Sequence, residues 1–163
     1  MLASTDACIG DSAEEAPLRQ FGAMGTLAAV STVTSAVKAL ALPSPSNNNT
    51  SAENTVKLVG YSGLMLPVME DTILAQRATE GRFTLRDLLM FSAVCGVGLD
   101  TVPIPGNTSA TVLAGVYMEV AALAFRLNKP LSCRVLPQQG KLAGDTTEVV
   151  SPYLCNSTVF PLC

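Results

Sequence analysis

The sequence contains no histidine and no tryptophan, and only 14% of its 163 residues are charged. Without histidine the chain can form neither a Ser-His-Asp triad nor a Cys-His pair, and it offers no imidazole to a metal ion. Five Phe and three Tyr are few rings for stacking on single-stranded nucleic acid. The ten basic residues are outnumbered by thirteen acidic ones and form no stripe along which a phosphate backbone could run. The sequence therefore predicts no metal site and no nucleic-acid partner.

What the chain does contain is typical of a folded α/β protein. Hydrophobic residues make up 48% of it and the mean hydropathy is +0.38, which is too apolar for a disordered chain. The length suits one domain, so we expect residues 1–163 to form a single α/β domain. Residues 43–54, rich in Pro, Ser and Asn, are expected to form a solvated, disordered-like loop.

Helical and extended patterns alternate along the sequence, which favours an α/β domain over a helical bundle. Apolar spacing and capping signals predict helices at residues 26–42, 70–79, 84–94 and 110–127. Extended segments are predicted at residues 55–59, 131–136 and 148–160. Two closely spaced prolines, Pro103 and Pro105, argue against a central strand at residues 101–106.

Two apolar stretches could be mistaken for membrane spans. Residues 110–127 approach the required length but carry Glu119 near the middle, where an acid costs about 2.5–3.5 kcal/mol in a bilayer. Residues 21–42 contain Lys38. We interpret both stretches as buried helices of a soluble protein that has no membrane partner.

The cysteines and the N-terminus predict a cytoplasmic protein. The five cysteines are odd in number and include no C-x-x-C pair, so we expect reduced thiols in a reducing compartment. The first residues have neither the basic region nor the apolar region of a signal peptide.

The most suggestive segment for chemistry runs from Cys95 to Asp100. A thiol followed by two glycines, Gly96 and Gly98, that let a ligand approach the backbone is a candidate nucleophile, and Asp100 is a candidate base or substrate anchor. The thiol, however, sits at a predicted helix C-terminus, where the helix dipole opposes a thiolate. Activation would need a cation from elsewhere, such as Arg82, Arg86, Arg126 or Arg134. The alternative is a small buried residue at a glycine-dependent turn.

A second candidate feature is a group of carboxylates. Glu70 and Asp71, next to Pro67, could join Asp100 in a ligand-binding cluster, or they could simply be acids at the N-terminus of a helix. Gly96 and Gly98 follow a predicted helix rather than a strand, so they do not form a dinucleotide fingerprint. The chain has no Walker-type phosphate loop either, and the sequence identifies no cofactor.

Several blocks resemble one family in order along the chain. They are GTLAA at residues 25–29, GYSGLMLPVMED at 60–71, SAVCGVGLDTVPIPG at 92–106, KPLSCRVLP at 129–137 and SPYLCNS at 151–157. The chain is identified as a member of the domain of unknown function 711 family, also called uncharacterised protein family 0210, for which we know of no established activity. The resemblance implies a closed, ten-stranded α/β barrel similar to that of glycyl-radical enzymes, with Cys95 on a loop of the barrel.

This chain departs from the family pattern in two ways. Family members are more than twice as long, so the resemblance implies an incomplete, C-terminal portion of the barrel. Several members also carry a histidine just before the Gly-Thr block, where this sequence has Met24. No glycyl-radical motif is found, so the resemblance does not imply radical catalysis.

Two classes of function remain open, and the residues do not decide whether the protein is an enzyme. The first is an enzyme-like barrel segment that binds an unknown small molecule near Cys95–Asp100, with Glu70, Asp71 and Arg134 as ligand-binding residues. The second is a non-catalytic structural or interaction remnant. A partial barrel leaves strand edges and apolar faces uncovered. We therefore expect the chain to form a homo-oligomer or to pair with a missing N-terminal portion.

Overall fold

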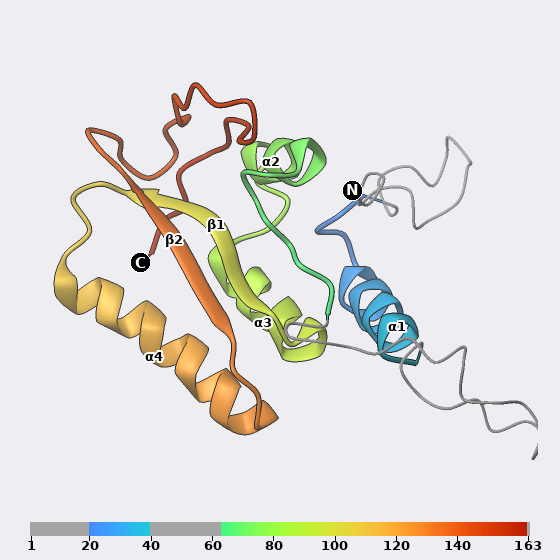
Figure 1. Ribbon diagram of the computed structural model, residues 1–163. Helices are drawn as coiled ribbons and strands as arrows, with labels where there is room; N and C mark the ends of the chain where they lie inside the picture. The colour runs from blue at the N-terminus through green and yellow to red at the C-terminus, as the bar shows by residue number, and fades with distance from the viewer. Residues whose placement is uncertain (1–19, 40–62, 163) are drawn as a thin grey trace, which may run out of the picture.

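The computed structural model describes residues 20–39 and 63–162. Its elements, in chain order, are α1 (Thr26–Ala39), α2 (Thr72–Thr79), α3 (Leu85–Cys95), β1 (Gly98–Pro105), α4 (Ala110–Leu127) and β2 (Ser132–Gln138) (Figure 1). Helices and parallel strands together confirm the predicted α/β class. The expected strand at 55–59 and the loop at 43–54 lie outside the described residues.

The helices begin and end where local sequence signals place them. Thr84 and Asp87 form a capping box at the start of α3, each side chain accepting from the other residue's backbone N–H. Ser109 caps α4. Gly96 ends α3 and Asn128 ends α4 in left-handed conformations, with φ of 66° and 49°. Three of the four predicted helices are thus confirmed closely, and the first is confirmed as far as residue 39.

The two strands are parallel and are joined by α4. Their register runs from Gly98 opposite Ser132 to Pro105 opposite Gln138. It shifts between Leu99 and Val102, so β1 contains a bulge at the residues between them. On the other edge of β1, Pro67 forms an isolated parallel bridge with Asp100. The described sheet has two strands, and the ten-stranded barrel stays a prediction.

The prolines argue against a central strand at residues 101–106, and the chain there is a strand with a regular partner, β2, on one side only among the described residues. β1 continues through Pro103 and Pro105, with β2 on one side. The carbonyl of Pro103 accepts from the N–H of Phe160, 2.9 Å away, so the backbone edge of this proline faces away from β2. In a parallel strand alternate residues bond to the same side, so Pro105 shares that direction and the ladder to β2 loses no donor.

The prediction that residues 110–127 form a buried helix is wrong. Among the 18 residues of α4 only Val116 and Val120 are buried, while Met118 and Phe125 are 72% and 87% exposed. Only one narrow stripe of α4 packs against the rest of the fold. Among the described residues nothing covers its opposite side. By length and composition α4 could cross a membrane, and 11% of it is buried. Helix α1 is likewise buried along one stripe only, through Thr26, Val30 and Thr34.

The core joins segments that are far apart in the sequence. Phe21, just before α1, packs edge-on against Phe83 and Phe91, with ring centres 5.2 and 5.3 Å away. Phe83 also packs against Phe160 near the end of the chain, at 5.8 Å. The predicted extended segment at 148–160 is not a regular strand, and its ladder contact is a single bridge between Thr146 and Thr158. Its last residues are held by backbone hydrogen bonds from Val159 to Asp145 and from Phe160 to Pro103, and by the packing of Phe160.

Candidate functional site

Asp100 lies in the bulge of β1 and is 2% exposed. The next residue, Thr101, has a positive φ of 45°, a strained conformation for a β-branched side chain. Its hydroxyl accepts from the N–H of Met69 at 3.3 Å, and the carbonyl of Asp100 accepts from Val68 at 3.2 Å. These two bonds hold the bulge in place. Retained strain of this kind is concentrated at functional sites in proteins.

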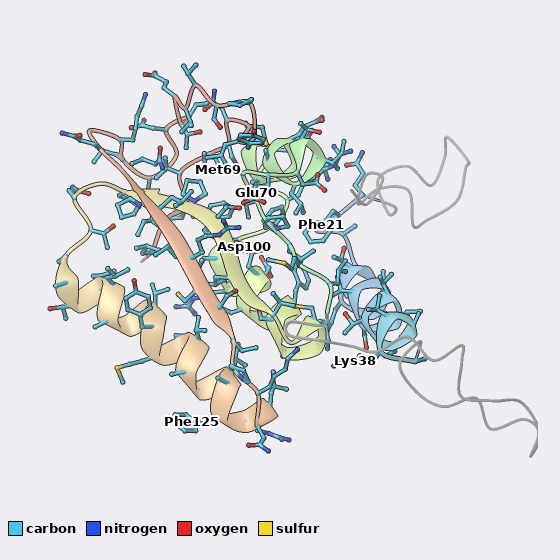
Figure 2. The ribbon with its side chains drawn as sticks, in the orientation of Figure 1. Phe21, Lys38, Met69, Glu70, Asp100 and Phe125 are labelled. Carbon is cyan, nitrogen blue, oxygen red and sulfur yellow. The ribbon has the colours of Figure 1, made fainter. Side chains whose placement is uncertain are left out.

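Arg134 on β2 binds the carboxylate of Asp100. Its Nε lies 2.5 Å from Asp100 Oδ1 and its Nη2 lies 2.7 Å from Glu70 Oε1. The neighbours Cys133 and Val135 pack against the hydrophobic core, so Arg134 points to the other face of the sheet. Figure 2 labels Asp100 on β1 and Glu70 nearer α2, on the side of the sheet that faces this helix. We call Glu70, Asp100 and Arg134 the Asp100 site.

The Asp100 carboxylate is not fully satisfied. Its Oδ2 atom is buried and has no hydrogen-bond partner among the described residues. A buried carboxylate oxygen without a partner is costly, and such atoms are uncommon in native proteins. The pKa of Arg134 is raised, mainly by its hydrogen bond to Asp100 and to a smaller extent by Glu70. The guanidinium therefore stays charged. The site thus holds one cation and two carboxylates, and Oδ2 of Asp100 can still accept a hydrogen bond.

Asp71 has a structural role as the N-cap of α2. It caps α2, and its Oδ1 accepts from the N–H groups of Ile73 and Leu74 at 2.8 and 3.0 Å. Of the two neighbouring acids that the sequence proposed for ligand binding, Glu70 therefore reaches the Asp100 site and Asp71 holds a helix.

Cys95 is the last residue of α3 and is 1% exposed, as the alternative of a buried residue at a turn requires. The negative end of the helix dipole lies there. Gly98 has a φ of 104°, and a Cβ on it would overlap the carbonyl oxygen of Ser132 in β2. Its absent side chain therefore lets the two strands approach each other.

Among the described residues Lys129 is the cation nearest to Gly96, and it is not one of the four arginines that the sequence suggested by number. A Cβ on Gly96 would lie 3.3 Å from Lys129 Nζ. Desolvation, the largest effect, and Lys38 lower the pKa of Lys129, while Cys95 raises it. Two of the four arginines proposed to activate the thiol have acidic partners: Arg134 binds Asp100, and Arg82 lies 3.5 Å from Glu80. The position of Lys129 directly after a helix stop signal was the one available clue.

The thiols are expected to alkylate slowly in the folded protein. Burial raises the pKa of Cys133, and burial followed by Asp71 raises that of Cys155, whose Sγ donates to Met69 O at 3.2 Å. At neutral pH we expect Cys95 to react slowest of the three because it is buried, with all three reacting at the rate of a free thiol after denaturation. Iodoacetamide labelling followed by peptide mass spectrometry measures this order. Rapid labelling of native Cys95 would contradict it and would restore the nucleophile hypothesis.

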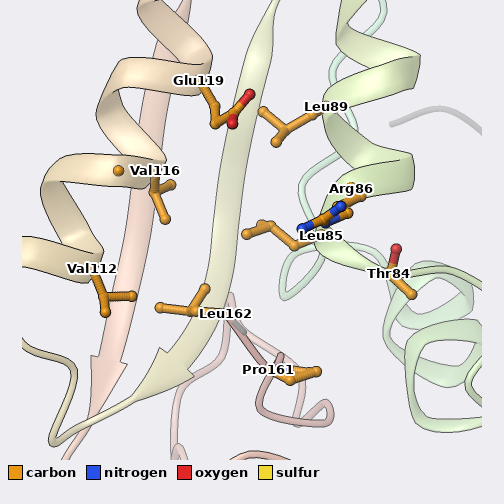
Figure 3. Close-up of a pocket in the computed structure, with 10 residues that line it drawn as sticks. Thr84, Leu85, Arg86, Leu89, Val112, Val116, Glu119, Pro161 and Leu162 are labelled. Atoms are coloured by element: carbon orange, nitrogen blue, oxygen red, sulfur yellow. The ribbon is translucent and has the colours of Figure 1, made fainter.

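A groove between α3 and α4 was not expected from the sequence. Its volume is about 640 Å³, and α3 and α4 flank it with β1 passing behind (Figure 3). Apolar side chains line the groove, and Leu85 and Val116 face each other across it. Arg86 and Glu119 bring opposite charges to its two walls. This cavity is not formed by Cys95 or by the Asp100 site.

Metal chemistry has no ready ligand set in this part of the protein. Within residues 20–39 and 63–162, no three Cys, Asp or Glu side chains come together as a metal-binding group. The two acids of the Asp100 site, Glu70 and Asp100, both bind the cationic side chain of Arg134.

Comparison with protein families gives a match over most of the chain. Residues 3–150 match the family described as Uncharacterised ACR (DUF711). The chain belongs to this family. The family resemblance read from the sequence blocks is thereby confirmed, whereas the similarity to glycyl-radical enzymes is not.

Relatives in the same family come from archaea and bacteria. The chain is 38% identical over 149 residues to a UPF0210 protein of Pyrobaculum arsenaticum, covering 89% of this chain and 31% of that protein. It is 36% identical over 140 residues to a UPF0210 protein of Leuconostoc mesenteroides, covering 86% of this chain and 29% of the relative. The chain thus spans about a third or less of the curated relatives it matches. No solved structure matches it significantly.

Proposed function

We propose that this protein binds a small polar molecule at the Asp100 site and belongs to an enzyme-like α/β module. The observation that carries the proposal is the buried carboxylate of Asp100, which has one oxygen on Arg134 and the other without a partner among the described residues. A fold has little reason to keep an unsatisfied carboxylate in a strained bulge unless a ligand can use it.

The chemistry of the site defines the class of ligand. Asp100 and Glu70 accept hydrogen bonds, which suits a hydroxyl or amine donor. The side chain of Arg134 is 50% exposed and forms the solvent-facing part of the site, where its remaining N–H groups suit a carboxylate or carbonyl oxygen. A small hydroxy acid or amino alcohol has both kinds of group. In a reaction, Asp100 would exchange a proton with the bound hydroxyl or amine.

The wider setting follows from the same proposal. The strands that would complete the site belong to a larger barrel, similar to that of glycyl-radical enzymes, which the longer relatives would contain. Cys95 would then support the turn beside the site rather than act as nucleophile, because it is buried at the negative end of a helix. The free thiols at Cys95, Cys133 and Cys155 suit a cytoplasmic protein.

Ligand-observed NMR on the purified chain tests this function. The probes are a panel of small hydroxy acids, amino alcohols, polyols and amines, measured with the wild type and with Asp100→Asn. The matched control is Glu148→Gln, which removes an acid from the exposed pair with Lys141. We expect saturation transfer to one or more probes with the wild type and the control, and its loss with Asp100→Asn. Equal signals from Asp100→Asn and the wild type would contradict the proposal, as would no binding by any probe.

A non-catalytic interaction module is the second candidate, and one observation favours it. Helix α4 exposes large apolar side chains, including Met118 and Phe125, over a surface that has no covering layer among the described residues. The two functions are compatible because the Asp100 site and the exposed side of α4 are formed by different residues.

A further inference from the structure

The groove between α3 and α4 has the size of a small-molecule site. Its volume of about 640 Å³ lies within the range of roughly 300–1,000 Å³ that ligand pockets occupy. Most of its lining residues are apolar, among them Leu85 and Leu89 on α3, Val116 on α4, and Leu162 (Figure 3). The groove therefore suits a ligand with an apolar body.

Two opposite charges border this apolar surface. Arg86 on α3 and Glu119 on α4 both line the groove and are both exposed. Figure 3 shows Glu119 extending from α4 toward α3. Neither side chain forms an ion pair or a hydrogen bond with any residue that the structure describes. The two walls therefore offer one positive and one negative group to a ligand that carries both charges.

Gly115 keeps the α4 wall of the groove open. A glycine inside a helix is less favourable than an alanine, so its presence there calls for a reason. Packing within the described chain supplies none, because an added Cβ would have no atom within 4 Å. Since Gly115 lines the groove, the missing side chain provides space inside it.

We propose that this groove binds a free α-amino acid with a large apolar side chain, such as leucine or phenylalanine. Arg86 donates hydrogen bonds to the α-carboxylate, and Glu119 accepts them from the α-ammonium group. The ligand side chain packs between Leu85 and Val116, in the space that Gly115 leaves open. This site is additional to the Asp100 site, because no residue of that site lines the groove.

The charges and the apolar surface together favour this ligand over others. A fatty acid would satisfy Arg86 but would leave the carboxylate of Glu119 without a donor beside an apolar chain. A peptide carries its two terminal charges at opposite ends, whereas a free amino acid carries both on one carbon atom. A small or polar amino acid would gain nothing from the apolar lining.

NMR titration of the ¹⁵N-labelled chain with L-leucine tests the proposal. Each of three analogues lacks one feature: N-acetyl-leucine the ammonium group, leucinamide the carboxylate, and free glycine the side chain. We expect saturable amide shifts on α3 and α4 with L-leucine, and binding weaker by about fivefold or more with each analogue. Glu119→Gln should abolish the preference over N-acetyl-leucine, and Arg86→Gln the preference over leucinamide. Arg126→Gln, which alters an exposed arginine outside the groove, is the control and should bind like the wild type.

Filling the groove provides an independent check. Gly115→Phe should be folded by far-UV circular dichroism and should lose leucine binding, whereas Ala114→Phe adds the same ring outside the groove and should retain it. Asp100→Asn should also retain it. Loss of binding in Asp100→Asn with retention in Gly115→Phe would assign the amino acid to the Asp100 site and overturn the proposal. The absence of saturable shifts up to the solubility limit of leucine would overturn it too, as would tighter binding of octanoate than of leucine.

Discussion

Replacing Gly98 with alanine is expected to destabilise the folded chain by about 3–5 kcal/mol. Gly98 has a φ of 104°, and the added Cβ would overlap the backbone of Ser132, the residue paired with it in β2. Backbone cannot move aside as a flexible side chain can, so the two strands would have to separate at the start of the sheet. Urea unfolding followed by circular dichroism measures the loss, as a lower midpoint at unchanged slope.

Gly140→Ala is the matched control for this substitution. Gly140 also has a positive φ, 73°, but an added Cβ would have nothing within 4 Å. Its cost should be about 1–2 kcal/mol, the conformational penalty alone. If the two variants lost the same stability, the close approach of β1 to β2 at Gly98 would be refuted.

Replacing Arg134 with glutamine is expected to cost about 2–3 kcal/mol of stability near neutral pH. The loss comes from Asp100, which would keep a buried negative charge with neither oxygen adequately bound. The figure is below that of a fully buried pair because half of the Arg134 side chain is exposed and water can reach the gap. Thermal or urea unfolding of the variant measures the loss.

Two further variants separate the contributions to this site. Glu70→Gln should cost less than about 1 kcal/mol, since its pair with Arg134 is largely exposed. Adding Asp100→Asn to Arg134→Gln should recover part of the loss, because the buried charge is removed together with its partner. A double variant less stable than Arg134→Gln alone would show that the Asp100 charge is stabilised by something other than Arg134.

The sequence offered all three members of the Asp100 site and grouped Glu70 with Asp100, but it did not pair Arg134 with either acid. Glu70, Asp100 and Arg134 each entered as candidates, from a helix start, a glycine-rich turn and the need for a cation. Arg134 was one of four arginines proposed to activate Cys95, 39 positions earlier in the chain, and was also proposed as a ligand-binding residue. In the structure it binds Asp100. Which cation meets which acid depends on the register of β2 against β1, and that register is a contact between strands separated by α4.

The prolines of β1 also show that contacts between segments distant in sequence decide what a residue does. A proline lacks its N–H wherever it stands, and from the sequence that loss argues against a central strand. The consequence depends on the side toward which the missing donor points. Pro103 turns its backbone edge to Phe160 and away from β2, so the ladder is intact.

The sequence by itself determined the α/β class, the helix ends and the family. Capping at Thr84 and Ser109 and the stops at Gly96 and Asn128 involve residues within a few positions of one another, so local chemistry suffices for them. Only the tertiary structure decided what is buried. The apolar composition of residues 110–127 predicted a buried helix, yet the two-stranded sheet covers one stripe of α4 and leaves Met118 and Phe125 exposed. Burial depends on how many layers surround an element, and that number is not a property of the element's own residues.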